Sequence, residues 1–230
     1  MEADRTEPQE GGGLEELVSV FTHELKTPIA AVQGLASTLR TSLDRLDHSD
    51  ALQVAEAIER SARHLGELVR SFADARALES GGLALHPEPT ALAELVRETV
   101  GELQPVLSGR PVSLELDEGA RAGVDPVRIR QVLTNLLANA AKYTPPGSPV
   151  EVTLQQAGGA VELAVRDHGP GIAPEQAESL FERHARLARG VPGSGLGLYL
   201  SRGIARAHGG DLVAVQPEGP GALLVLRLPA

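Results

Sequence analysis

The chain has 230 residues and a formal net charge of −10, from 21 Lys and Arg against 31 Asp and Glu. This acidic balance lacks the positive footprint of a general nucleic-acid-binding protein. The absence of cysteine excludes disulfides, thiol catalysis and cysteine-ligated metals. No apolar run approaches the roughly 20 residues of a membrane span, and no secretory signal is visible, so we expect a soluble protein or the soluble part of a larger one.

Residues 1–13 are polar, acidic and glycine-rich, which predicts a disordered lead or linker. From Leu14 to Leu46, apolar residues recur in steps of three and four, which predicts a long helix. The segment 47–50 interrupts this pattern, and Asp50 with Gln53 is predicted to form a capping box. A second apolar seam then predicts another helix, which stops at a Ser-Gly-Gly sequence.

Two such helices form a hairpin that buries its apolar seams poorly when alone. We therefore expect a twofold dimer whose two hairpins make a four-helix bundle. Beyond residue 83 the pattern changes to alternating strands and helices, which predicts an α+β fold: a hairpin domain over 14–80, then an α/β sandwich over 83–230 with helices on one face of a mixed sheet. Helices are predicted over 91–107 with Thr90 as N-cap, 126–143 with Asp125 as N-cap, and 195–207, and strands over 112–116, 150–155, 160–166, 211–215 and 223–228.

The sequence FTHELKTPIA in the first helix carries a candidate nucleophile, His23. Two residues of helical rotation place His23 about 200° from the apolar seam, so the imidazole is predicted to face solvent. Glu24 is adjacent and suits holding one imidazole tautomer, while Thr27 follows one turn later on the same face. The alternative is an ordinary surface histidine on an acidic helix with a tolerated kink at Pro28.

Three polar residues share one side of the otherwise aliphatic helix over 126–143: Asn135, Asn139 and Lys142. Asparagine is a poor helix former, so two in register need a reason other than helix stability. Amide oxygens suit Mg²⁺ and an ammonium group suits phosphate. The alternative is a set of helix-surface polar residues.

Two glycine-rich segments complete the pattern. In the first, Asp167 follows a predicted strand and precedes Gly169 and Gly171, so its carboxylate suits an adenine amine that the glycines allow to approach; the alternative is an ordinary turn. The second, GSGLGL over 193–198, opens a predicted helix, which is typical of a phosphate site. It matches neither the Rossmann nor the P-loop fingerprint.

In their order and joint presence, these segments resemble the catalytic core of bacterial sensor histidine kinases over about residues 14–230. FTHELKTPIA resembles the family's phosphoacceptor box and QVLTNLLANAAKYTPPG its asparagine box. DHGPGI and GSGLGLYLSRGIARAHGG resemble the two glycine boxes, and LFERHAR the phenylalanine box. The chain departs from the family at His184 and Ala185, where an aromatic pair is common, so the resemblance implies a less apolar anchor for the short lid over about residues 187–196.

The resemblance implies a dimeric phosphoacceptor domain followed by an ATP-binding sandwich of the type shared with gyrase and Hsp90. It implies that His23 is phosphorylated, that Glu24 acts as base or tautomer anchor, and that Thr27 orients water in a second, phosphatase activity. A structural alternative for Thr27 is a hydroxyl bond to the His23 carbonyl.

The implied ATP site uses Asn139 as the Mg²⁺ ligand and Asn135 and Lys142 on the phosphates. Tyr143 lies near the adenine, whose amine donates to Asp167. The remaining implied residues of the ATP site are Gly169, Gly171, Arg186, Gly193, Gly195, Leu196 and Gly197.

The implied cofactors are ATP and Mg²⁺, and the implied partners are a second copy of the chain, a response-regulator receiver domain, and a sensor domain or subunit outside this chain. The implied location is the cytoplasm, alone or as the cytoplasmic part of a membrane-bound sensor. Two other functional classes fit the sequence less well. A gyrase-type ATPase needs a water-activating glutamate at position 135, where this chain has asparagine, and a non-catalytic scaffold does not require every main family position to be filled.

Overall fold

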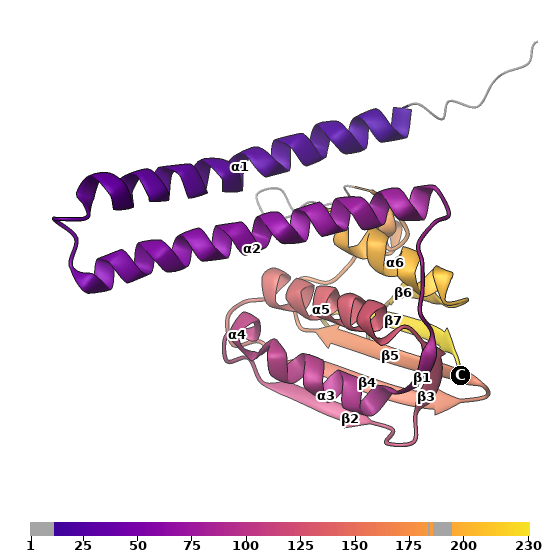
Figure 1. Ribbon diagram of the computed structural model, residues 1–230. Helices are drawn as coiled ribbons and strands as arrows, with labels where there is room; N and C mark the ends of the chain where they lie inside the picture. Colours follow the sequence, from indigo (N-terminus) through magenta and orange to yellow (C-terminus); the bar gives the residue numbers. More distant parts are fainter. Residues whose placement is uncertain (1–11, 184, 186–194) are drawn as a thin grey trace, which may run out of the picture. The chain divides into compact units, whose positions relative to one another are not determined.

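The computed structural model describes residues 12–183, 185 and 195–230 of the chain. The chain divides into two compact units, Met1–Ala73 and Asp74–Ala230 (Figure 1). The first unit is helical, and the second contains a β-sheet with helices packed on it. Within the described residues, no helix is both long and apolar enough to span a membrane.

Two long helices form an antiparallel hairpin, as predicted. Helix α1 spans Gly12–Ser42 and helix α2 spans His48–Glu79. Phe21, near the start of α1, stacks on Phe72, near the end of α2, with ring centroids 4.1 Å apart and planes inclined by 16°. Both aromatic rings come from the apolar seams that predicted the hairpin, so the seams face each other.

The connection between the two helices differs in detail from the prediction. Helix α1 ends at Ser42, whose carbonyl accepts turn hydrogen bonds from the N–H groups of Arg45 and Leu46. The side chain that caps α2 is Asp47, whose Oδ1 accepts from the Asp50 N–H at 2.8 Å. The predicted capping box at Asp50 was therefore wrong, because α2 begins at His48 and the N-cap position is the residue before it.

The second unit is a mixed five-stranded sheet with helices on one face, which confirms the predicted α+β fold (Figure 1). The sheet order is β2-β4-β5-β7-β6; β2 and β4 are parallel and the other pairs are antiparallel. Its strands are β2 (Val112–Leu116), β4 (Val150–Ala157), β5 (Ala160–Asp167), β6 (Asp211–Val215) and β7 (Ala222–Pro229). The helices are α3 (Leu92–Glu102), α4 (Gln104–Leu107), α5 (Pro126–Tyr143) and α6 (Gly197–Ala207), with 3₁₀ turns at Pro174–Gln176 (η1) and Ser179–Phe181 (η2).

Two short strands were not predicted: β1 (Glu88–Ala91) pairs antiparallel with β3 (Arg121–Val124). Thr90, the predicted N-cap of the next helix, is a strand residue opposite Ala122, and no side chain caps α3. The predicted helix over 91–107 is also divided into α3 and α4. Four-residue strands carry too little alternation to be recognised locally, because their pairing depends on residues about thirty positions away.

Helix α5 follows its sequence signals closely. Asp125 is the N-cap, with Oδ1 accepting from the N–H groups of Val127 at 3.0 Å and Arg128 at 3.2 Å, and Pro126 occupies the first turn. Burial opposes ionisation of the Asp125 carboxyl, but backbone hydrogen bonds from His86, Arg128 and Val127 outweigh it and lower the pKa. The apolar side of α5 is fully buried in an aliphatic core that also contains Leu154, Leu163, Leu212 and Leu226.

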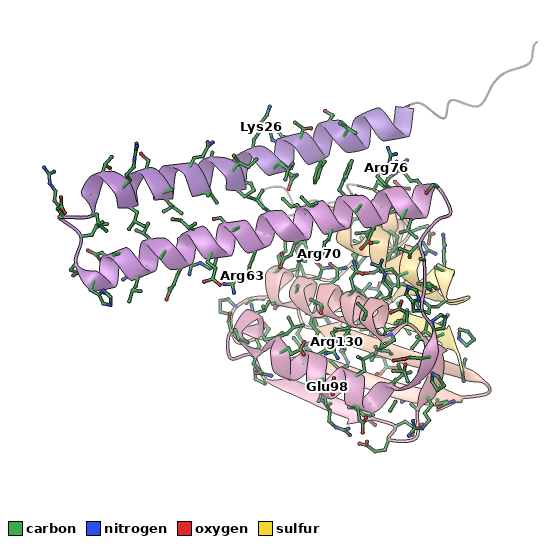
Figure 2. All side chains as sticks on the ribbon, in the orientation of Figure 1. Lys26, Arg63, Arg70, Arg76, Glu98 and Arg130 are labelled. Atoms are coloured by element: carbon green, nitrogen blue, oxygen red, sulfur yellow. The ribbon has the colours of Figure 1, made fainter. Side chains whose placement is uncertain are left out.

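Ion pairs fasten α3 to α5 on the solvent side. Arg130 of α5 contacts Glu98 of α3 at 2.8 Å and Glu102 at 3.2 Å. Figure 2 shows Arg130 and Glu98 pointing toward one another. Both glutamates are more than 60% exposed at their side chains, so these pairs contribute little stability compared with the core.

A better shielded pair joins α6 to β6. Arg202, whose side chain is 11% exposed, donates from Nε to Asp211 Oδ1 at 2.8 Å and from Nη2 to Oδ2 at 3.1 Å. Its guanidinium also pairs with Glu178 and lies 4.8 Å from the centroid of the Phe181 ring. These hydrogen bonds from Arg202 hold the pKa of Asp211 well below its ordinary value.

We expect Asp211→Asn to destabilise the protein by about 1–2 kcal/mol at pH 7, because it removes the carboxylate that accepts two of the Arg202 hydrogen bonds and leaves Arg202 paired with the exposed Glu178. A carboxyl with a lowered pKa stabilises the fold above its unfolded pKa, and this contribution is lost as the pH falls toward the folded pKa. In urea unfolding, the difference in the free energy of unfolding between wild type and Asp211→Asn should therefore be smaller at pH 3 than at pH 7. Glu162→Gln, which alters the exposed pair with Arg227, is the control. If Asp211→Asn lowered the free energy of unfolding equally at both pH values, the stabilising role of the Asp211 carboxylate would be contradicted.

Candidate functional site

The first part of the candidate site lies on α1, in the first unit. His23 and Thr27 are exposed, as the helical spacing predicts, and Glu24 between them is half-buried. Pro28 lies inside α1 and is buried, which places it on the packed side of the helix. An imidazole on the solvent side of a helix can be reached by a reacting group from outside that helix.

Thr27 differs from other threonines of α1. The hydroxyls of Thr22, Thr38 and Thr41 donate to the carbonyls four residues earlier, at 2.7, 3.0 and 2.8 Å. Among the described side-chain hydrogen bonds, Thr27 makes no such bond to the carbonyl of His23. The structural alternative for Thr27 is therefore not observed, and its hydroxyl faces solvent one turn from the imidazole.

The second part of the site lies in the second unit, where α5 meets the start of α6. Asn135 is half-buried, and its Nδ2 donates to Ser201 Oγ at 2.9 Å. A Cβ on Gly197 would lie 2.2 Å from Asn135 Oδ1, so only glycine allows the first turn of α6 to approach this close. One turn further along α5, Asn139 is also half-buried and Lys142 is exposed. The polar side of α5 therefore faces the N-terminus of α6, where backbone N–H groups favour an anion.

The carboxylate of Asp167 is held at the end of β5 by two backbone amides. Its Oδ1 accepts from the N–H of Gly169 at 2.8 Å and from the N–H of Ala222 at 3.2 Å. Both hydrogen bonds that the described residues make to this carboxylate use Oδ1, so Oδ2 remains as the acceptor for a ligand. Gly221 has φ +111°, and a Cβ there would lie 1.8 Å from the Asp167 carbonyl, so the start of β7 packs directly on this turn.

The glycine turn after Asp167 also contacts the end of α5. A Cβ on Gly169 would lie 2.9 Å from the Tyr143 carbonyl oxygen and 3.2 Å from Thr144 Cγ2. Beside this contact, Lys142 Nζ lies 4.7 Å from the centroid of the Tyr143 ring. The absence of a side chain at Gly169 thus lets the asparagine-bearing helix and the aspartate-bearing turn touch.

The structure brings most of the predicted residues of the second unit into one region formed by α5, the turn after β5 and the start of α6. Those described are Asn135, Asn139, Lys142, Tyr143, Asp167, Gly169, Gly171, Gly195, Leu196 and Gly197. Arg186 and Gly193, and His184 of the departing pair, lie outside the described residues. Sequence reasoning missed Ser201 and Gly221, which support the site. The glycines around Pro220 were the available signal, because a Gly-Pro-Gly turn before a strand often allows a close approach.

The oxygen donors of this region fit a magnesium ion held jointly with a phosphate ligand. Among the described residues, no group of three or more His, Asp or Glu side chains gathers as a metal site. Mg²⁺ commonly uses only one or two protein oxygens together with substrate phosphates and water. The half-buried amide of Asn139, between Asn135 and Lys142 on α5, meets that requirement.

Comparison with known families assigns both units. Residues 14–81 match the His Kinase A (phospho-acceptor) domain. Residues 124–230 match the histidine kinase-, DNA gyrase B- and HSP90-like ATPase domain. The first match contains His23, and the second contains every described residue of the α5–α6 site.

The chain is similar to several known proteins. The chain is 35% identical over 201 residues to a bacteriophytochrome of Pseudomonas aeruginosa, covering 85% of this chain and 27% of the relative. The solved mycobacterial sensor histidine kinase MprB is 32% identical, with a TM-score of 0.58, over 63% of this chain and 97% of that one. The structure of histidine kinase ThkA in complex with response regulator protein TrrA is 24% identical, with a TM-score of 0.67, over 94% of this chain and 61% of that one. The chain spans 24–30% of the length of the first curated relatives it matches.

Proposed function

Because the chain belongs to the sensor histidine kinase family, we propose that it is an ATP-dependent protein-histidine kinase of a two-component system. It phosphorylates its own His23 and passes the phosphoryl group to an aspartate of a response regulator. The observation that carries this proposal is the pairing, in one chain, of a solvent-facing histidine in a phosphoacceptor domain with an ATPase-type domain whose Asp167 retains one carboxylate oxygen for a ligand.

Nucleotide binding would use the contacts already described. Asp167 Oδ2 accepts a hydrogen bond from the exocyclic amine of adenine, and Tyr143 lies against the base. Lys142 and the N-terminus of α6 at Gly197 meet the phosphates, together with Asn135 and the glycines before α6. Asn139 would hold Mg²⁺, which neutralises charge on the phosphates when bound. We assign Arg186 and Gly193 to the same site from the resemblance alone.

The transfer step needs a neutral imidazole and a bound ATP. One ring nitrogen of His23 attacks the γ-phosphorus, the new N–P bond forms as the bond to the bridging oxygen breaks, and ADP leaves. Glu24 holds or accepts the proton on the other ring nitrogen, which keeps the attacking nitrogen unprotonated. Incubation with γ-labelled ATP and Mg²⁺ tests the proposal: the label should appear on the protein and resist alkali but not acid.

The product chemistry points to the partner. A phosphoramidate is a high-energy bond, so transfer to a carboxylate of a receiver domain is favourable. The ThkA relative was solved with a response regulator protein, which supports the same class of partner here. We propose that the sensed signal comes from a domain or subunit outside this chain, and that the protein works in the cytoplasm, alone or as the cytoplasmic part of a membrane-bound sensor.

We also propose a homodimer through the hairpin domain, residues 14–80, with the ATP-binding domain over 83–230. The described hairpin leaves large apolar side chains in solvent, and a second copy would cover part of them in a four-helix bundle. These side chains are Val18, Ile29, Leu43, Leu52 and Val69, which are 41–60% exposed.

A gyrase-type ATPase is the weaker proposal. That activity requires a general base near the metal ligand, and position 135 holds an amide that cannot take a proton from water. The Asn135 amide instead donates to Ser201, which gives it a role in joining α5 to α6.

For Thr27 we propose a role in dephosphorylating the response regulator. The solvent-facing hydroxyl can orient water toward a phosphoaspartate on a docked receiver domain. Thr27→Ala should leave the rate of His23 labelling within about threefold and slow regulator dephosphorylation about tenfold or more, because only the second step uses the oriented water. Thr38→Ala, which removes a hydroxyl bonded to the Gly34 carbonyl on the same helix, is the control. A parallel fall in both rates, or no change in either, would contradict the assignment.

A further inference from the structure

Arg110 is a buried cation that the mechanism above does not use. It is 8% exposed, and its guanidinium makes four hydrogen bonds. Nη2 donates to the carbonyls of Ala141 at 2.7 Å and Thr144 at 3.2 Å, Nε donates to Thr144 Oγ1 at 3.4 Å, and Nη1 donates to the Leu107 carbonyl at 3.1 Å. None of these acceptors is a carboxylate, and no ion pair of Arg110 occurs among the described residues.

The acceptors explain how a buried charge is tolerated without a counterion. Ala141 lies in the last turn of α5 and Thr144 is its C-cap residue. The C-terminus of a helix carries unpaired carbonyls and a partial negative charge, so it attracts a guanidinium. Arg110 therefore serves as an external cap on the end of the helix that carries the asparagines.

The backbone before Arg110 adopts a costly conformation to place it there. Ser108 has φ +51° and Gly109 has φ +72°, and Ser108 is the single non-glycine residue with positive φ in the described part of the chain. This left-handed pair ends α4 and lets the Arg110 N–H donate to the Leu107 carbonyl at 3.0 Å. Backbone strain of this kind persists where the surrounding contacts require it.

The contacts of Arg110 continue into the nucleotide site. Thr144, which is 7% exposed, accepts two of the four hydrogen bonds. Its methyl group and the Tyr143 carbonyl lie where a Cβ on Gly169 would meet them, and the Gly169 N–H donates to Asp167 Oδ1. Two residues, Thr144 and Gly169, thus connect Arg110 to the Asp167 carboxylate.

A second connection runs through the sheet. Pro111, the next residue, accepts a hydrogen bond from the Val150 N–H at 2.9 Å. Val150 begins β4 and lies opposite Asp167 in the β4–β5 register. Residues 110–111 therefore contact both elements that flank Asp167. Arg110 contacts the end of α5, and Pro111 contacts the start of β4.

We propose that Arg110 is a positioning residue for nucleotide binding: it holds the end of α5 so that Tyr143 and Thr144 rest on the turn that carries Asp167. The proposal rests on the proposed function, because it assumes that this turn binds adenine. Arg110 touches no reacting atom, so its loss should weaken nucleotide affinity and raise KM while leaving kcat nearly unchanged.

The test compares variants of the full chain in two measurements: ADP binding by calorimetry, and KM and kcat for labelling of His23. Arg110→Met keeps the aliphatic stem and removes every donor, and we expect ADP affinity to fall about tenfold, KM to rise similarly and kcat to stay within about threefold. Arg110→Lys keeps the charge but has no planar fork to reach all four acceptor atoms, so an intermediate loss is expected. Arg97→Met, an exposed arginine of α3 that pairs with Glu118, is the control and should match wild type.

A third variant guards against a simple loss of folding. Thr144→Val keeps the shape of the side chain and removes only the hydroxyl, so it should lower ADP affinity a few-fold, and its effect should not add to that of Arg110→Met. Urea midpoints are measured for all variants. Reduced midpoints with ADP affinity equal to the Arg97→Met control would overturn the proposal, as would a fall in kcat at unchanged KM. A wild-type chain that fails to bind ADP would overturn the proposed function together with it, whereas normal wild-type binding with unchanged variants would overturn this proposal alone.

Discussion

His23→Gln should reduce ATP-dependent labelling of the protein to background. Glutamine preserves helix propensity and polarity at an exposed position of α1, so the hairpin should fold normally, but its amide nitrogen is not nucleophilic. The measurement is incorporation of γ-labelled phosphate with Mg²⁺, followed by acid and alkali treatment of the labelled protein. ADP affinity should be unchanged, because the nucleotide site is assigned to the second unit.

His64→Gln is the matched control for this change. His64 is also a helical histidine, half exposed and next to an acidic partner, Glu67, at 3.7 Å. If the label depends on His23 as an individual nucleophile, the His64 variant should label at the wild-type rate. Label that persists at the wild-type level in His23→Gln would identify another acceptor and would reject the assignment of the phosphoacceptor.

Asp167→Asn should weaken ATP binding about 100-fold, because it places a donor where the adenine amine needs an acceptor. The asparagine Oδ1 can still accept from the Gly169 and Ala222 amides, so the turn keeps its geometry. The Nδ2 group then occupies the position of the ligand-facing oxygen. Calorimetry with ATP gives the affinity, and ITP, whose purine ring carries a carbonyl in place of the amine, should gain relative to ATP.

Asp117→Asn is the control for the adenine contact. Asp117 has the same local geometry, because its Oδ1 accepts from the N–H of Gly119, two residues later, at 2.9 Å. Unlike Asp167, it lies in an exposed turn between β2 and β3. This variant should bind ATP as the wild type does. Unchanged ATP affinity in Asp167→Asn, or an unchanged preference between ATP and ITP, would show that the adenine lies elsewhere.

Much of the fold follows from local sequence signals. The three- and four-residue apolar spacing predicted the hairpin, and Asp125 followed by Pro126 predicted the start of α5. Such signals succeed because a helix face and an N-cap depend on residues within about four positions of each other. The same reasoning failed at Asp50 and Thr90, where the first residue of the element was uncertain and a one-residue shift transfers the cap to another side chain.

For the candidate site, the sequence by itself predicted which residues would carry the chemistry: an exposed His23 from its helical position, and Asn135, Asn139 and Asp167 from residue type and spacing. Only the tertiary structure decided which Asp167 oxygen accepts backbone hydrogen bonds, because one donor, the N–H of Ala222, lies 55 residues later in the chain. It also decided that Ser201 fastens Asn135 and that Arg110 caps α5. These roles depend on side chains and amides that are distant along the chain and meet only when the sheet is assembled, so no local periodicity records them.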